Sequence, residues 1–279
     1  MNRREDSRLP DISEYLRDKS RRGHSEDNET SGRGLVLHRN HVDLAERAKR
    51  ASEIAQMRHD YLLSPASVRE NKIISSSNVN EPAANAFREL RRSVFHFTEK
   101  PDPIVMVTGV AGDVGSTFVA RNLAAAIALE EVSTALYVDC NIRNAQQSQD
   151  DGRYGLTDYL ESKDVSEDEI IQQTGILRLR KIGAGRSREL PGEYFSSSRL
   201  RYLFQNISTR YPDRSVIIDG PPVSTDTAIL ADLCDAVLLV LAFGRSTEQQ
   251  VANALSVLGP EKIMGCVFND QPLVPEFQW

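Results

Sequence analysis

One stretch near the middle of the chain, residues 107–124, constrains the fold more than any other. Its sequence is VTGVAGDVGSTFVARNLA, and an apolar run at residues 104–107 leads into it. A helix is predicted to begin at Thr117, after a turn whose glycines are Gly109, Gly112 and Gly115. Glycines let backbone amides converge on phosphate oxygens, and the helix N-terminus adds a partial positive charge. The stretch therefore predicts a phosphate-binding loop (P-loop).

The usual lysine of such a loop is missing. The common pattern ends in Gly-Lys-Ser/Thr, where the lysine neutralises the β- and γ-phosphates and the hydroxyl ligates Mg²⁺. Here Ser116 stands at the lysine position and the hydroxyl is present as Thr117. The candidate nucleotide-binding residues are Gly112, Gly115, Ser116, Thr117, Phe118 and Asn269. Asn269, just past the final predicted strand, resembles a position near the adenine in related P-loop folds, and capping of a turn is its alternative role.

Length and composition limit the class of protein. The 279 residues suffice for one α/β domain of about 200 residues and an extension. A net charge of -6 argues against a nucleic-acid binder, which needs a basic face. No run approaches the roughly 18 apolar residues of a membrane span, and the N-terminus lacks a signal-peptide pattern, so we expect a cytoplasmic protein. Three cysteines in apolar runs are expected to be buried free thiols: Cys140, Cys234 and Cys266.

The chain divides at about residue 80. Residues 1–80 carry dense mixed charge and are predicted to be a partly disordered extension with a helix at 41–58. In residues 81–279, short apolar strands alternate with helices, which predicts a largely parallel sheet with helices on both faces. The predicted strands are 104–107, 135–139, 177–182, 215–219, 236–241 and 263–268. The predicted helices are 82–97, 117–130, 156–162, 199–209, 226–233 and 247–258.

Two aspartates follow predicted strands at the edge that carries the P-loop. Asp139 ends ALYVD, and Asp219 ends SVIID. Ligands of parallel α/β sheets bind beyond the carboxyl ends of the strands, where a carboxylate can hold Mg²⁺. Asp139 and Asp219 are therefore the candidate catalytic residues and, with Thr117, the candidate metal ligands. Capping of the following turn is the alternative role for each aspartate.

Several further segments carry a family resemblance. NAFRELRRSVFHF, from Asn85, is similar to EAFRxLRTNLxF, and VTGVAGDVGSTF resembles VTSxxPGEGKST. ALYVDCNIR resembles LLIDADLR, and VIIDGPPVSTDTAILADLCDAVLLV resembles IIIDTPPVLxxxDAxxLAxxxDGVLLV. These patterns are those of the cytoplasmic kinase domain of bacterial tyrosine kinases (BY-kinases) of capsule and exopolysaccharide synthesis. That family lies within the MinD/ParA-like class of P-loop NTPase-like folds, and the resemblance covers about residues 82–270.

The resemblance implies an ATP-dependent tyrosine kinase that uses ATP or ADP with Mg²⁺. It implies a membrane polysaccharide co-polymerase or export protein as partner, which would recruit the chain to the inner face of the plasma membrane. It also implies a homo-oligomer, with Arg88 and Arg91 at the oligomer or partner interface. An exposed helix face with local ion pairs to Glu89 is the alternative for these arginines.

The departures from the family pattern concern the chemistry. Ser116 replaces the lysine, Asp113 adds a negative charge to the loop, and Asn141 replaces the second acid of the DxD-type motif. Asn85 replaces the glutamate of the interface motif, and no tyrosine follows Tyr211. Loss of one preorganised stabilising donor costs on the order of 10²–10³ in rate in a well-studied hydrolase. The sequence therefore favours a pseudokinase or regulatory partner, in which binding of nucleotide and Mg²⁺ is open.

Two alternatives belong to other classes of function. The first is an active tyrosine kinase in which Arg121 or Arg143 supplies the missing cation. The second is a MinD/ParA-type ATPase switch, which also relies on the P-loop lysine.

Overall fold

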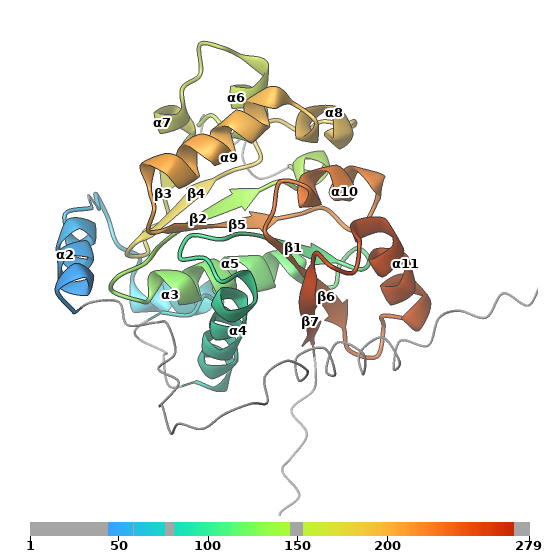
Figure 1. Ribbon diagram of the computed structural model, residues 1–279, viewed down its shortest axis with the longest axis horizontal. Coiled ribbons are helices and arrows are strands. Elements are labelled where there is room, and N and C mark those ends of the chain that lie inside the picture. The colour runs from blue at the N-terminus through green and yellow to red at the C-terminus, as the bar shows by residue number, and fades with distance from the viewer. Residues whose placement is uncertain (1–43, 58, 76–80, 146–152, 271–279) are drawn as a thin grey trace, which may run out of the picture. The chain divides into compact units, whose positions relative to one another are not determined.

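The computed structural model describes residues 44–57, 59–75, 81–145 and 153–270, which all belong to one compact unit (Figure 1). The predicted disorder falls mainly on residues 1–43, which lie outside the described residues. The predicted helix at 41–58 is present as α2 (Leu44–Ala55). None of the helices in the described ranges is both long and apolar enough to cross a membrane.

One sheet organises the described chain. Its strand order is β3-β4-β2-β5-β1-β6-β7, and all neighbouring pairs are parallel except β3 with β4. This confirms the predicted, largely parallel sheet. The strands are β1 (Ile104–Gly109), β2 (Thr134–Asp139), β3 (Gln172–Gln173), β4 (Leu179–Ile182), β5 (Arg214–Asp219), β6 (Ala236–Ala242) and β7 (Ile263–Asn269).

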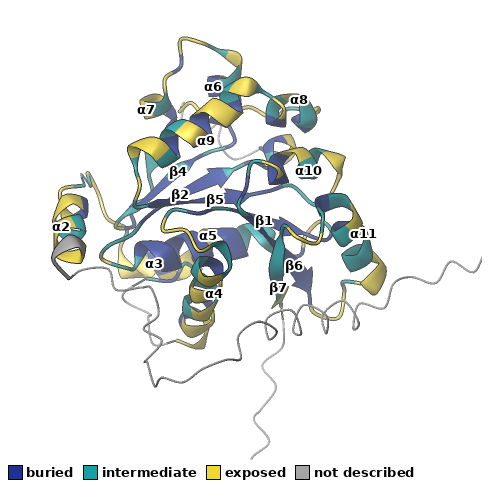
Figure 2. Cartoon of the chain, viewed as in Figure 1, coloured by how far each residue is buried: buried dark blue, intermediate teal, exposed yellow. Residues whose placement is uncertain are grey.

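Helices cover both faces of the sheet, and each face has its own apolar core (Figures 1 and 2). On one face lie α4 (Pro82–Thr98) and α5 (Ser116–Ala128), whose inner residues pack on the strands. The other face is covered by α6 (Leu156–Glu161), α7 (Glu167–Ile170), α8 (Pro191–Phe195), α9 (Ser198–Arg210), α10 (Thr225–Ala231) and α11 (Glu248–Leu258). The central strands are buried because both of their faces are covered, which explains their continuous apolar sequences.

The predicted and observed elements differ where side chains are polar or the segment is short. The strand predicted at 177–182 begins at Leu179, because Arg178 adopts a positive φ of 61° and Leu177 is exposed. Strand β3 is only two glutamines long and was not predicted. The short helices α3 (Pro65–Glu70), α7 and α8 were also missed, because they span too few residues for a helical apolar pattern.

The prediction that all three cysteines are buried is wrong for Cys266. Cys140 and Cys234 are buried, but Cys266 is exposed. Its strand, β7, lies at the edge of the sheet, and its residues are only partly covered. An apolar neighbourhood in the sequence does not show whether a strand is central or at an edge.

The segment between α2 and α4 packs against the sheet and α5. The amide of Leu63 donates to the carbonyl of Gly175 at 2.8 Å. The amide of Ile74 donates to Oδ1 of Asn122 at 2.8 Å, and this contact is buried. Residues 59–75 therefore form part of the wall around the site described next.

Candidate functional site

The loop between β1 and α5 has the tight backbone of a P-loop. Gly115, the residue before α5, has a φ of 87°, and a Cβ there would collide with the amide of Asn269. A Cβ at Gly109 would collide with the side chain of Val114. Asn269 reaches the same turn, since its Nδ2 donates to the carbonyl of Val114 at 3.0 Å. The helix that follows leaves its first amides free to receive an anion.

Asp139 and Asp219 meet at the carboxyl edge of the sheet. They are direct partners on β2 and β5, and Asp219 is 1% exposed. Oδ2 of Asp219 accepts a 2.7 Å hydrogen bond from the Tyr137 hydroxyl, while its Oδ1 is buried without a hydrogen-bond partner among the described residues. Burial, followed by the charge of Asp139, raises the pKa of Asp219 to about 7. Burial also raises the pKa of Tyr137 well above its usual value, so the phenol keeps its proton and acts as donor.

A pocket of about 530 Å³ opens beside these carboxylates. Thr117 lies at its P-loop end, and Tyr61 and Leu63, from the segment before α3, line its opposite wall. Two cationic side chains, those of Arg121 and Lys181, line the same pocket. Acidic, cationic and aromatic groups thus face one cavity next to the P-loop, although they come from five separate segments of the chain.

Asn141, at the position of the second acid of the family's DxD-type motif, follows β2. Its backbone N–H donates to Oδ1 of Asp139 at 3.0 Å. The next residues form a 3₁₀ turn, Ile142–Asn144. That turn is attached to a distant loop: the amide of Arg188 donates to the Ile142 carbonyl at 3.0 Å, and the Ser187 hydroxyl donates to the Arg143 carbonyl at 2.7 Å. The position of Asn141 therefore depends on the loop that contains Ser187 and Arg188.

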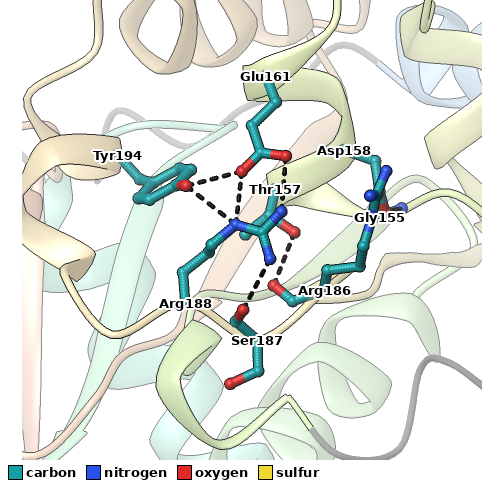
Figure 3. A network of polar contacts seen from close by, with 8 residues as sticks. All are labelled: Gly155, Thr157, Asp158, Glu161, Arg186, Ser187, Arg188 and Tyr194. Carbon is teal, nitrogen blue, oxygen red and sulfur yellow. Dashed lines mark hydrogen bonds and ion pairs between the residues drawn. The ribbon is translucent and has the colours of Figure 1, made fainter.

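Figure 3 shows what holds that loop. Arg188 makes a two-pronged ion pair with Glu161, with N–O distances of 2.5 and 2.7 Å, and the Tyr194 hydroxyl donates to Glu161 at 2.7 Å. Nε of Arg186 contacts Asp158 at 2.7 Å. The hydrogen bond from Arg188 lowers the pKa of Glu161 to about 2 despite partial burial. The network ties α6 to the loop and so supports the acidic edge of the site.

Two arginines near the site, Arg143 and Arg245, contact groups on neighbouring loops. Nη2 of Arg143 donates to the Glu189 carbonyl at 3.1 Å and lies 4.0 Å from Asp226. The guanidinium of Arg245 pairs with Asp270 at 2.7 Å, and it touches the Asp113 carbonyl of the P-loop at 3.4 Å. Sequence reasoning did not identify Arg245, because no spacing rule connects the turn after β6 with the P-loop.

The structure also places the remaining predicted residues. The Phe118 ring packs edge-on against Phe87 of α4, with centroids 5.9 Å apart, so its side chain faces the helix layer. Gly112 is exposed at the tip of the P-loop, and Ser116 and Thr117 begin α5.

The two interface candidates differ from one another. Arg91 is 12% exposed and is used within the chain: it pairs with Glu130 at 2.6 Å and donates to the Ala126 carbonyl at 3.1 Å. Arg88 bonds Asn85 on the same helix. The local contacts of Arg91 account for this side chain without a partner molecule.

A resident divalent cation fits this site poorly. One observation favours a metal, namely the buried Oδ1 of Asp219 without a partner. Against it, the other oxygen of Asp219 already accepts from Tyr137, and the carboxyl group's pKa is near neutrality. Two cationic side chains, those of Arg121 and Lys181, share the pocket and would repel a divalent cation. The assignment of Thr117, Asp139 and Asp219 as metal ligands stays a prediction.

A parallel sheet with this loop and these acids defines a P-loop NTPase-like α/β domain. No family model matches the chain. It is 30% identical over 204 residues to the tyrosine-protein kinase Etk of Escherichia coli, and the aligned region covers 70% of this chain and 28% of Etk. It is 32% identical over 198 residues to the putative tyrosine-protein kinase EpsB of Ralstonia nicotianae, and the aligned region covers 68% of this chain and 26% of EpsB.

The solved kinase domain of Escherichia coli Etk superposes with a TM-score of 0.61 at 26% identity, covering 78% of this chain and 91% of that domain. The BceF tyrosine kinase domain has the same fold, with a TM-score of 0.60 at 24% identity over 73% of this chain and 86% of that one. The chain belongs to the bacterial tyrosine-kinase (BY-kinase) family. It spans about a quarter of the length of the curated relatives it matches.

Proposed function

We propose that this chain is a BY-kinase-like regulatory domain that has lost most of its phosphoryl-transfer activity. The observation that carries the proposal is Ser116 at the position of the P-loop lysine. Transfer of a phosphoryl group depends on positioning and on neutralisation of charge, since the protein does little covalent chemistry. The loop keeps the backbone that could hold phosphate and lacks the cation that would stabilise the transition state.

Two arginines near the site support the proposal, because each guanidinium has a partner outside the P-loop. Arg143 is held by the Glu189 carbonyl, and Arg245 is held by Asp270. Arg121 lies one helical turn beyond Thr117 and lines the pocket beside the acids.

By analogy with the polysaccharide role that the sequence resemblance implies, the domain would act in exopolysaccharide or capsule synthesis or export. Its partner would be a membrane polysaccharide co-polymerase or export protein, which would bring it to the inner face of the plasma membrane. The chain would assemble as a homo-oligomer, with Arg88 and Arg91 at the oligomer or partner interface.

Nucleotide binding and turnover by the purified chain test the proposal. We expect ADP and ATP to bind weakly by calorimetry, with no phosphotyrosine formed on the chain. Ser116→Lys should bind ATP at least about tenfold more tightly, because it restores a charge next to the phosphates. The matched control is Ser196→Lys, which adds the same charge after α8.

The second candidate function is an active tyrosine kinase, which the contact of Arg245 with the P-loop carbonyl of Asp113 favours. It predicts phosphotyrosine on the unmodified chain, or on a tyrosine-containing peptide, and loss of this product in Asp219→Ala. Robust turnover by the unmodified chain would rule out the regulatory proposal.

A further inference from the structure

Two positively charged side chains approach the carboxylate pair from separate elements. Successive residues of a strand alternate between faces, so Tyr137 and Asp139 share the face of β2 that α5 covers. Asp219 lies directly opposite Asp139, and Lys181 lies opposite Tyr137 on the other neighbouring strand. Arg121 descends from α5, four residues after Thr117, and so lies on the same side of that helix. Together they line the 530 Å³ pocket.

Tyr137 connects the cations with the acids. Its ring centroid lies 5.8 Å from the Arg121 guanidinium, and its hydroxyl donates to Asp219 at 2.7 Å. Within the described residues, no ion pair under 4.0 Å joins Arg121 to either aspartate, so their attraction acts across the pocket. Burial disfavours the charge of Arg121, but the nearby phenol and the two carboxylates outweigh it and raise the arginine's pKa. Arg121, with Lys181, likewise counteracts the effect of burial on the pKa of Asp139.

We propose that Arg121 and Lys181 are built-in counter-cations of the Asp139–Asp219 pair and take the place of a divalent cation. Two carboxylates carry at most two negative charges, and a guanidinium with an ammonium group supplies two positive ones. A divalent ion that approaches this pair meets two like charges, the ammonium group of half-buried Lys181 and the guanidinium of Arg121, whose residue is exposed, and both repel it. The state of the site is therefore independent of Mg²⁺. This proposal does not depend on whether kinase activity is lost.

The test uses the full chain and MgCl₂ or MnCl₂ without nucleotide. The unmodified protein should show no stoichiometric Mn²⁺ binding by electron paramagnetic resonance and no change of Tm with MgCl₂. The double variant Arg121→Met/Lys181→Met leaves two carboxylates without counter-charge, so it should bind Mn²⁺. Its Tm should rise by roughly 5 °C at about 100 times the Kd for Mg²⁺.

Two variants control for the charge change itself. Arg201→Met removes a guanidinium from an exposed position of α9 and should leave Tm insensitive to MgCl₂. Adding Asp139→Asn to the double variant removes one carboxylate and should abolish the gained Mn²⁺ binding. Stoichiometric Mn²⁺ binding by the unmodified chain overturns the proposal. A folded double variant whose Tm does not change with MgCl₂ overturns it as well. If the double variant does not fold, Mn²⁺ titration of the unmodified chain decides alone.

Discussion

The two sides of the candidate site have diverged in different ways. The P-loop side keeps its backbone: Gly115 has the positive φ that the turn requires, and Asn269 closes on it. Its charge differs from the family pattern, because Ser116 replaces the lysine and Asp113 adds a carboxylate. The acidic side has Asp139 and Asp219 but Asn141 at the second acid of the family motif, and Tyr137, Arg121 and Lys181 surround the two aspartates. The P-loop turn is held mainly by its backbone conformation and by Asn269, whereas the charges on the acidic side are balanced by side chains from separate elements.

The largest expected effect comes from breaking the P-loop side. Gly115→Ala should destabilise the chain by about 2 kcal/mol, because alanine is strained at positive φ and its methyl group meets the Asn269 amide. Urea unfolding measures the change. Gly112→Ala is the matched control within the same loop, since its Cβ would meet nothing within 4 Å and stability should change by less than about 0.5 kcal/mol. Equal effects of the two variants would show that the turn is not held as described.

A smaller effect is expected on the acidic side. Tyr137→Phe removes the donor to buried Asp219 and should cost about 1 to 2 kcal/mol of the free energy of unfolding. Tyr202→Phe, exposed on α9, serves as the control and should be neutral. A neutral Tyr137→Phe would mean that the aspartate does not rely on this phenol, and the contrast between the two sides would weaken.

The smallest effect concerns the support beneath the acidic side, and it depends on pH. Because the folded-state pKa of Glu161 is about 2, below its ordinary 4.5, its contribution to stability is present above about pH 4.5. It is lost as the pH falls through 2. Glu161→Gln should therefore be less stable than the unmodified chain by about 1 kcal/mol at pH 7, with the gap closing between about pH 4.5 and 2.

Glu193→Gln, at an exposed position of α8, makes the same charge change and is the control, which should be as stable as the unmodified chain at pH 7. Thermal unfolding at several pH values measures both variants. A pH-independent difference for Glu161→Gln would show that the side chain stabilises the loop by packing rather than by its charge.

The fold was predictable because its signals are local. Continuous apolar strands with helices between them indicated the parallel sheet, and β1, β2, β5 and β6 lie where expected. The glycines of the P-loop and the aspartates at strand ends could be identified, because each marks a fixed place along the chain. Strand β3 could not, since two glutamines become a strand only by pairing with β4.

The contacts between distant segments were beyond sequence reasoning. The spacing of Arg88 and Arg91 suggested that both side chains lie on an exposed helix face. Arg91 instead donates to the carbonyl of Ala126, near the end of α5. Cys266 lies in an apolar segment and is still exposed, because its strand, β7, is at the edge of the sheet. The strand order is a property of the tertiary structure and could not be predicted from the local sequence.

By itself, then, the sequence determined the P-loop turn, the missing lysine, the parallel sheet and the edge at which Asp139 and Asp219 meet. These follow from residue type and spacing, which set local conformation and strand direction. Only the tertiary structure decided that Arg121 and Lys181 share a pocket with those acids, through Tyr137. Electrostatic neutralisation depends on distances in space, and 60 positions of chain separate the two cations in the sequence.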